Sequence, residues 1–179
     1  MYIVLGLGNP GVEYENTRHN VGYRVVERIA SENRVKFKIS RGIFQYAIIK
    51  DKSEKNPSFI IAKPLTFMNL SGIAAKDLLE EFSESVASLI VVHDDIDLDI
   101  GVLKIKKDGG SGGHKGIESI IKTIGSKDFI RIKIGVGRPR TKDEVIDYVL
   151  TPFKRSEEEL IDNMVIEAIE TIYDFINQG

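Results

Sequence analysis

The sequence predicts an α/β protein, a single three-layer domain over residues 1–179 with a twisted mixed sheet and helices on both faces. Short apolar runs alternate with helical patterns, and the central runs are continuously apolar, as in buried strands of a largely parallel sheet. A length of 179 residues with 42% hydrophobic and 29% charged residues is ordinary for one globular domain with its own core.

The first half of the chain predicts one helix among four strands. Residues 2–7 form an apolar run typical of a buried strand, and a loop rich in glycine and asparagine follows. Four aliphatic residues recur at helical spacing between Val21 and Ile29, which predicts a helix over about residues 19–31. Further apolar runs predict strands at 35–39, 44–49 and 59–62.

The second half alternates more regularly. Ser71 stands where it can cap a helix, and Gly125 can end another that starts at about His114. Ser156 with Glu159 three residues later has the spacing of a capping box, so we expect the last helix to run from there to about residue 176. Apolar runs predict the remaining strands at 89–92, 102–105 and 130–136.

The composition bounds the setting in which the protein works. The chain has no cysteine, which excludes disulfides and thiolate chemistry and fits a reducing compartment. No basic leader precedes the first predicted strand, and the longest apolar stretches fall well below the roughly 18 residues of a membrane span. We therefore expect a soluble, cytoplasmic protein.

The net charge of −2 hides an uneven distribution. Residues 104–142 hold 11 basic and three acidic residues, whereas residues 143–179 hold two basic and ten acidic residues. These blocks are either ordinary solvated faces or, in the basic segment, a surface that meets a polyanion. The overall pI of about 6.0 does not by itself indicate nucleic-acid binding, but the local block permits it.

Polar loops follow three of the predicted strands. GLGNPG follows residues 2–7, KPLTFMN follows 59–62, and HDD follows 89–92. Open α/β sheets bind ligands beyond the carboxyl ends of their strands. If these three strands are parallel neighbours, the loops bring four polar side chains into one crevice: Asn9, His19, Asn69 and Asp94.

The stretch GLGNPG fits the pattern G-x-G-x-x-G at Gly6, Gly8 and Gly11. A dinucleotide-binding turn needs its helix to begin within the pattern, and an acidic residue about 20 positions later at the end of a second strand. Here Pro10 and VEYENTR precede the predicted helix, and Glu27 falls inside it. The glycines are therefore expected to let the backbone turn sharply and present Asn9.

His19 and Asp94 form the candidate pair for acid–base chemistry. His19 opens the predicted helix, where the helix dipole disfavours imidazolium and favours the neutral form that a general base requires. A carboxylate at a strand end can accept from one imidazole nitrogen and leave the other available for a proton. The competing interpretation, turn formation and exposed charge, suits Asp97 and Asp99 better than Asp94.

The chain offers no nucleophile to accompany this pair. No serine stands in a nucleophile elbow and there is no cysteine, so the pair points to direct hydrolysis by an activated water. A metal site would need three convergent ligands. None of the usual ligand spacings occurs, so we predict neither metal nor cofactor. Five residues could in principle supply the ligands: His19, His93, Asp94, Asp95 and His114.

Five blocks of the sequence together resemble bacterial peptidyl-tRNA hydrolase. They are GLGNPGVEY with TRHNVG, KPLTFMNLSG, VVHDDIDLDIG, GGSGGHKG and GVGRP, in the family's order over roughly residues 3–139. The resemblance implies an enzyme that cleaves the ester between a peptide and the 3′ ribose of tRNA and so recycles tRNA from stalled translation. It also implies a monomer that needs no metal.

The resemblance implies roles for individual residues. His19 is the base that activates water, and Asp94 holds its imidazole in the basic tautomer. Asn9 helps to distinguish a blocked amino terminus from a free one. Asn69 binds the peptide backbone or the scissile carbonyl and can help to stabilise the oxyanion. Three further residues are expected to line the site for the peptide and the tRNA end: Tyr14, Phe67 and Met68.

The tRNA contacts implied by the resemblance include Lys106 and two positions that depart from the family pattern. Lys115 stands where an asparagine is usual, so a contact that holds water and substrate is in doubt, because lysine donates but does not accept. Lys133 replaces a common arginine and keeps only the charge. Eight basic residues are expected to flank the crevice and meet the tRNA backbone: Lys104, Lys106, Lys107, Lys115, Lys122, Lys127, Arg131 and Lys133.

Three other functions remain as alternatives. Relatives of this fold serve in RNA splicing without catalysis, and the lysine at position 115 favours such an RNA-binding protein. Retention of the base His19 and its partner Asp94 argues against it, because binding alone needs neither. A metal-dependent hydrolase of another substrate and a dinucleotide-dependent oxidoreductase complete the set.

Overall fold

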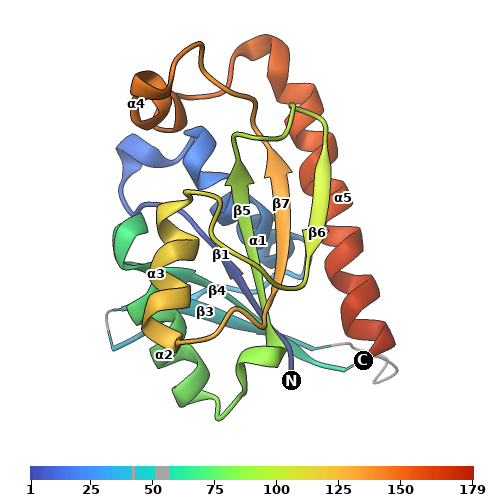
Figure 1. Ribbon diagram of the computed structural model, residues 1–179. Helices are drawn as coiled ribbons and strands as arrows, with labels where there is room; N and C mark the ends of the chain where they lie inside the picture. Colours follow the sequence, from blue (N-terminus) through green and yellow to red (C-terminus); the bar gives the residue numbers. More distant parts are fainter. Residues whose placement is uncertain (42, 51–56) are drawn as a thin grey trace.

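The structure is a computed structural model that describes residues 1–41, 43–50 and 57–179. Within these residues a seven-stranded sheet has the order β2-β3-β4-β1-β5-β7-β6 (Figure 1). Four central strands are parallel, and they are β4 (Phe59–Pro64), β1 (Ile3–Gly6), β5 (Leu89–Asp95) and β7 (Ile130–Gly135). Three strands at the sides run antiparallel to their neighbours, and they are β2 (Lys38–Ser40), β3 (Phe44–Ile49) and β6 (Leu103–Lys106).

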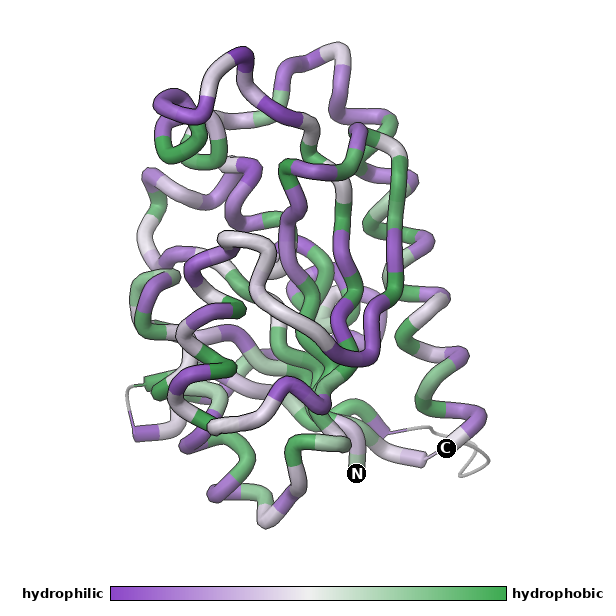
Figure 2. The backbone as a smooth tube through the Cα atoms, viewed as in Figure 1, coloured by the Kyte–Doolittle hydropathy of each residue, from purple (hydrophilic) through white to green (hydrophobic). Residues whose placement is uncertain are grey.

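Helices cover both faces of this sheet. On one face α1 (Val21–Glu32) and α5 (Glu158–Gln178) pack against one apolar cluster, and on the other α2 (Ser71–Glu81) and α3 (Lys115–Ile124) pack against a second. Figure 2 shows the hydrophobic strands enclosed between these layers. The short helix α4 (Val145–Val149) lies beyond the carboxyl ends of the strands (Figure 1). The predicted three-layer α/β class with a mixed sheet is confirmed.

Several boundaries differ from the sequence-based expectation. Helix α1 begins at Val21, because the turn Arg18–Asn20 that carries His19 is a separate 3-10 helix, η2. Strand β2 is Lys38–Ser40, not 35–39, and the side chains of Val35 and Phe37 pack on the core without strand pairing. Five other 3-10 turns occur in the described residues: Val12–Tyr14 (η1), Met68–Leu70 (η3), Val86–Ser88 (η4), Lys142–Glu144 (η5) and Arg155–Glu157 (η6).

Two predicted helix caps are wrong. Ser71 is the first residue of α2, and its hydroxyl donates to the backbone carbonyl of Met68. The capping box of the last helix lies before the predicted one, since the Glu157 carboxylate accepts from the backbone N–H of Lys154. The predicted end of α3 is correct, because Gly125 adopts the left-handed conformation after Ile124.

Glycines bring η2 and α1 down onto the strand ends. A Cβ on Gly22 would lie 2.3 Å from the carbonyl oxygen of Val92, and one on Gly6 would lie 2.2 Å from the carbonyl oxygen of Gly22. A Cβ on Gly8 would likewise clash with the ring of Tyr23. Only Gly11, with φ of 120°, serves the turn expected of all three loop glycines. This packing sets His19 beside the end of β5.

No helix in the described part of the chain has the length and apolarity to span a membrane.

Candidate active site

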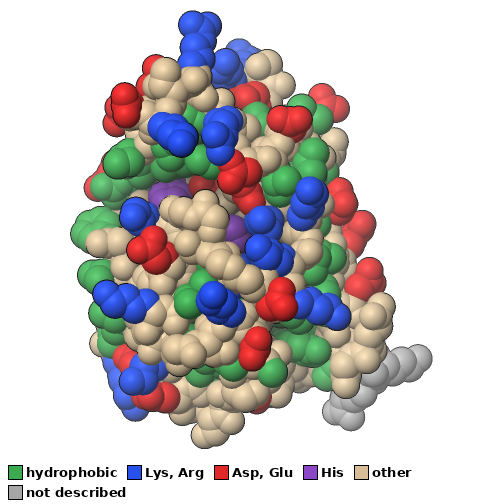
Figure 3. Space-filling view, in the orientation of Figure 1, with side chains coloured by type: hydrophobic (Ala, Val, Ile, Leu, Met, Phe, Trp, Pro, Cys, Tyr) green, Lys and Arg blue, Asp and Glu red, His purple; other side chains and the backbone are tan. Residues whose placement is uncertain are grey.

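A cleft of about 830 Å³ opens at the carboxyl ends of β1, β4, β5 and β7. Those strands are the parallel neighbours that the sequence pattern required, and the cleft brings Asn9, His19, Asn69 and Asp94 together. Figure 3 shows histidine surface within a hollow bordered by lysine and arginine side chains. Six more residues that were expected at the crevice line it: Phe67, Met68, Lys106, Lys115, Arg131 and Lys133.

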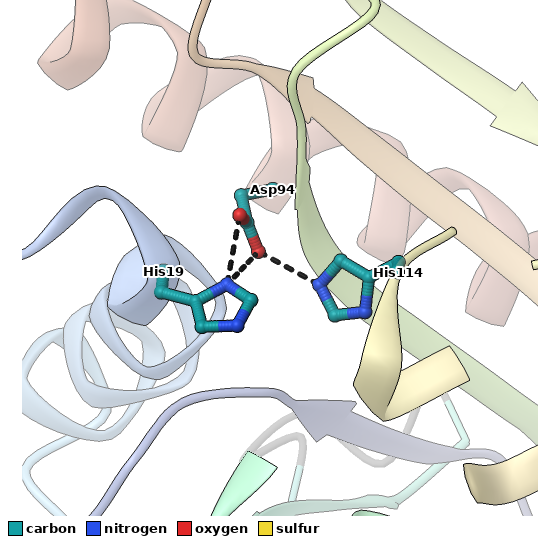
Figure 4. A group of neighbouring side chains, drawn as sticks. All are labelled: His19, Asp94 and His114. Atoms are coloured by element: carbon teal, nitrogen blue, oxygen red, sulfur yellow. Dashed lines mark hydrogen bonds and ion pairs between the residues drawn. The ribbon is translucent and has the colours of Figure 1, made fainter. Parts of the chain in front are cut away.

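Asp94 is the centre of the site, because all three histidines of the chain contact it. Its carboxylate lies 2.9 and 3.0 Å from Nδ1 of His19 and 2.8 Å from Nε2 of His114 (Figure 4). Its backbone carbonyl accepts from Nδ1 of His93 at 2.7 Å. Asp94 reaches this position because β5 continues through the HDD segment, where the predicted strand stopped at residue 92, and pairs there with β7.

These contacts set the protonation of the cluster. Burial opposes ionisation of Asp94, but its interactions with His19 and His114, which include a hydrogen bond from each ring, outweigh it and hold the pKa of Asp94 well below its ordinary range. Burial also disfavours the charged form of His19 and so lowers its pKa. The charge of Asp94 and its hydrogen bond outweigh this effect and raise the pKa of His19 above 6.5 overall. The sequence analysis considered the helix dipole, which disfavours imidazolium, whereas Asp94 favours the charged form of His19. Burial, as the largest cause, and the neighbouring His114 lower the pKa of His93 to about 3.

The tautomer of His114 is fixed by the helix that it caps. Its Nδ1 accepts from the backbone N–H groups of Gly116 and Ile117 at 3.1 and 3.2 Å, so the ring hydrogen lies on Nε2 and is donated to Asp94. Donor atoms of His19, Asp94 and His114 lie within 4.8 Å of one another, a proximity that the sequence spacing did not indicate. A metal bound through Nε2 of His114 would require that nitrogen to lose its hydrogen, which opposes the cap of α3.

Asn9 presents a hydrogen-bond donor to the cleft. Its side-chain oxygen accepts from the backbone N–H of Met68 at 2.7 Å, which leaves the side-chain NH₂ for a ligand. Asn20, which the sequence analysis did not single out, holds the loop by accepting from the backbone N–H of Asn9 and donating to its carbonyl, both at 2.9 Å. Three hydrogen bonds therefore fix the buried Asn9.

Phe67, Met68 and Asn69 follow β4 at the start of η3. Met68 is buried, whereas the side chains of Phe67 and Asn69 are exposed in the cleft wall. Tyr14 does not line the cleft. It packs edge-on against Phe67, with ring centroids 6.4 Å apart, and so contacts a residue of the cleft wall.

The basic residues divide into two groups. Lys106 and Lys115 stand at the rim, and the Lys115 side chain is 70% exposed. Lys133 lies deeper and pairs with Asp95 at 2.8 Å. Arg131 lines the cleft, but its side chain is buried and donates to the carbonyls of Gly109 and Gly110, so it holds the glycine-rich loop. Its expected contact with the tRNA backbone stays a prediction. Four expected residues lie outside the cleft lining: Lys104, Lys107, Lys122 and Lys127.

Sequence reasoning missed part of the opposite wall. The segment between β7 and α4 contributes Arg138, Arg140 and Lys142, and α4 contributes apolar side chains that include Ile146 and Val149. The helix α4 itself was not predicted. His114 was considered only as a metal ligand, although its place directly after the glycine-rich loop and before the apolar positions of α3 marks it as a helix cap.

The model of one protein family, described as peptidyl-tRNA hydrolase, matches residues 3–179. The chain belongs to the peptidyl-tRNA hydrolase family. It is 45% identical over its whole length to the peptidyl-tRNA hydrolase of Thermodesulfovibrio yellowstonii, of which the alignment covers 94%. It is 42% identical over 98% of its length to that of Persephonella marina, with 91% of the relative covered.

A solved member of the family has the same fold. The crystal structure of peptidyl-tRNA hydrolase from Acinetobacter baumannii superposes with a TM-score of 0.92 at 29% identity and covers 100% of this chain and 89% of that one. The family indicated by the five sequence blocks is therefore confirmed.

Proposed function

We propose that this protein hydrolyses the ester between the peptide and the tRNA in peptidyl-tRNA, and so returns tRNA from stalled translation. The observation that carries the proposal is the pair His19–Asp94 within the cleft. Nδ1 of His19 faces the ionised carboxylate of Asp94, and Nε2 points away from it (Figure 4). Family membership supplies the substrate class.

The geometry supports a direct attack by water. Nε2 of His19 takes a proton from a water molecule, whose oxygen attacks the ester carbonyl carbon and forms a tetrahedral intermediate. When the bond to the ribose oxygen breaks, the imidazolium of His19 returns the proton to that oxygen, so the products are a peptide acid and a free tRNA 3′ hydroxyl. Asp94 stabilises the transient imidazolium. No metal, cofactor or covalent enzyme intermediate is required.

The side-chain amides are suited to the oxygen of the reacting carbonyl and to the peptide backbone. Asn9 retains only donor hydrogens toward the cleft, and Asn69 is exposed beside it. We assign the oxyanion or the scissile carbonyl to Asn69 and a peptide carbonyl next to the blocked amino group to Asn9. Phe67 and Met68, with Tyr14 packed against Phe67, provide the surface for the acyl side chain and the terminal nucleoside.

The basic rim would hold the tRNA backbone. Lys106 lines the cleft, and Lys115 is 70% exposed with a loose pairing to Glu118 at 3.6 Å on its own helix, so both can meet phosphates, whereas Lys133 is partly neutralised by Asp95 at 2.8 Å. Lys115 is assigned to phosphate and not to the water, since its amine cannot accept a hydrogen bond. In line with the family resemblance, we infer that residues 1–179 act as one domain, as a monomer in the cytoplasm.

The test is hydrolysis of N-acetyl-aminoacyl-tRNA beside the same tRNA with a free amino group, in the presence of a chelator. We expect release from the blocked substrate only. The His19→Ala variant should lose about 10²–10⁴-fold in kcat and bind tRNA within twofold of the parent protein. Tight binding of the blocked substrate by the parent protein without release would instead establish the non-catalytic RNA-binding alternative. Loss of activity with the chelator would establish the metal-dependent one.

A further inference from the structure

The carboxylate of Asp94 serves two imidazoles at once. His19 Nδ1 and His114 Nε2 both donate to it, and Oδ1 accepts from both rings, at 3.0 and 2.8 Å (Figure 4). A hydrogen bond donated to a carboxylate stabilises its charge and weakens its attraction for a second partner. A change in the hydrogen bond from His114 to Asp94 therefore changes the interaction of Asp94 with His19, although the structure shows no hydrogen bond between the two rings.

We propose that His114 is a positioning residue that acts on His19 through Asp94, as a hydrogen-bond donor whose direction is fixed by the helix it caps. The inference rests on the proposed hydrolase function and adds to it a residue that sets the strength of the base. Because the backbone of α3 occupies Nδ1, the ring cannot turn its donor away from Asp94 without leaving two backbone N–H groups unpaired.

The surroundings hold His114 in this orientation. The ring of His93 packs edge-on against it, with centroids 4.6 Å apart, while Nδ1 of His93 binds the carbonyl of Asp94. The buried Arg131 fixes the loop that leads into His114. The side chain of His114 is 9% exposed, so solvent competes little for its donor.

Few other charges act on His19 in the described part of the chain. Besides the cluster itself, the ionisable groups that line the cleft are His93, the pairs Asp95–Lys133 and Asp97–Arg138, and the cations Lys106, Lys115, Arg131, Arg140 and Lys142. Of all charged groups, Asp94 is the one that shifts the pKa of His19. Arg18, the neighbour of His19 in sequence, turns its guanidinium to Tyr148 and Glu157. Loss of the hydrogen bond from His114 to Asp94 is therefore the change that most directly increases the attraction between Asp94 and a protonated His19.

The deciding variant is His114→Asn. An asparagine side-chain oxygen can still accept from Gly116 and Ile117 and so keep α3 capped, but the shorter side chain cannot reach Asp94. Without the donor, Asp94 holds the proton on His19 more strongly, and more enzyme is inactive at low pH. We expect the acid limb of the kcat profile to move upward by roughly 0.5 pH unit. KM should change less than twofold, since no rim lysine is altered.

Two readouts separate positioning from structural support. In the His114→Asn variant the NMR titration of His19 should shift upward together with the rate profile, while the Gly116 and Ile117 amides remain protected from hydrogen exchange. In His114→Ala the same shift should come with loss of that protection. The kcat deficit of His114→Asn should shrink as pH rises, whereas damage to the fold would lower kcat equally at every pH.

An unchanged His19 titration in His114→Asn overturns the inference, whether or not activity falls. A pH-independent loss of kcat also overturns it. Failure of the hydrolase proposal is distinguishable, because the parent protein would then show no hydrolysis at any pH, whereas the His19 titration is measured without substrate.

Discussion

The guanidinium carbon of Arg18 lies 4.0 Å from the centroid of the Tyr148 ring, and the two residues join the start of the active-site turn to α4. Arg18 is 2% exposed, donates to the carbonyls of Tyr148 and Thr151, and pairs with Glu157 at 3.3 Å. The residue next to the proposed base thus anchors the wall on the far side of the cleft.

Arg18→Leu is expected to lower the free energy of unfolding by about 3–5 kcal/mol, since it leaves buried carbonyls and Glu157 without their partner. Urea unfolding measures the loss. The matched control is Arg28→Leu, which removes a half-exposed pair with Glu32 on α1 and should change stability by less than about 1 kcal/mol. Equal losses in the two variants would contradict the anchoring role.

Gly22→Ala is expected to destabilise the protein by about 3 kcal/mol or more, because the new methyl would meet the Val92 carbonyl at 2.3 Å and backbone cannot easily move there. Activity should fall with stability as His19 is displaced from Asp94. Gly110→Ala is the control, since nothing lies within 4 Å of its Cβ position. A Gly22→Ala variant with the parent's thermal midpoint would disprove the close contact.

Asp94→Asn should change both the height and the pH dependence of the rate. The pKa of His19 is raised because Asp94 favours its charged form, so activity of the parent protein should rise with pH through a value above 6.5. Without the carboxylate charge, burial lowers the pKa of His19, and the limb should move to lower pH. The plateau should fall by roughly 10²–10⁴-fold, since Nδ1 loses the partner that fixes the tautomer.

The measurement is kcat from pH 5 to 9 with the chelator present. The direction of the Asp94→Asn shift is opposite to that expected for His114→Asn, so each variant controls for the other. An Asp94→Asn limb at higher pH than the parent's would refute the electrostatic account of both.

Lys106→Ala should weaken tRNA binding and reduce the magnitude of the slope of log K against log salt by about one, as expected for one phosphate contact. Binding of uncharged tRNA between 50 and 200 mM salt tests this. Lys76 on α2, half-exposed and far from the cleft lining, is the matched lysine, and Lys76→Ala should leave the slope unchanged. If both variants alter the slope alike, the interaction is diffuse and the rim is not a specific contact.

Much of this architecture follows from local patterns. Continuously apolar runs at 59–62 and 89–92 predict buried parallel strands, and the polar residues after them predict the side of the sheet where the cleft opens. Gly125 marks a helix end because a left-handed residue is needed there, whatever the tertiary contacts. Such features depend on a few consecutive residues.

The parts that failed depend on contacts distant in sequence. Arg131 looks like a surface cation in the sequence, but it is buried and donates to the carbonyls of Gly109 and Gly110. The raised pKa of His19 comes from Asp94, which lies 75 positions away in the sequence and outweighs the effect of burial. The double role of His114 requires both the cap of α3 and the end of β5, which the chain brings together only in the folded sheet.

The unequal charge blocks occupy different faces of the molecule. The basic rim stands on β6 and α3, whereas six of the ten acidic residues of the C-terminal segment lie on α5, on the opposite face of the sheet from α3, and the other four lie between β7 and α5. A molecule with a small net charge therefore carries a sizeable electric dipole. A nucleic acid approaching within roughly a Debye length, about 8 Å at physiological salt, would rotate the protein before touching it, so that collisions occur cleft first.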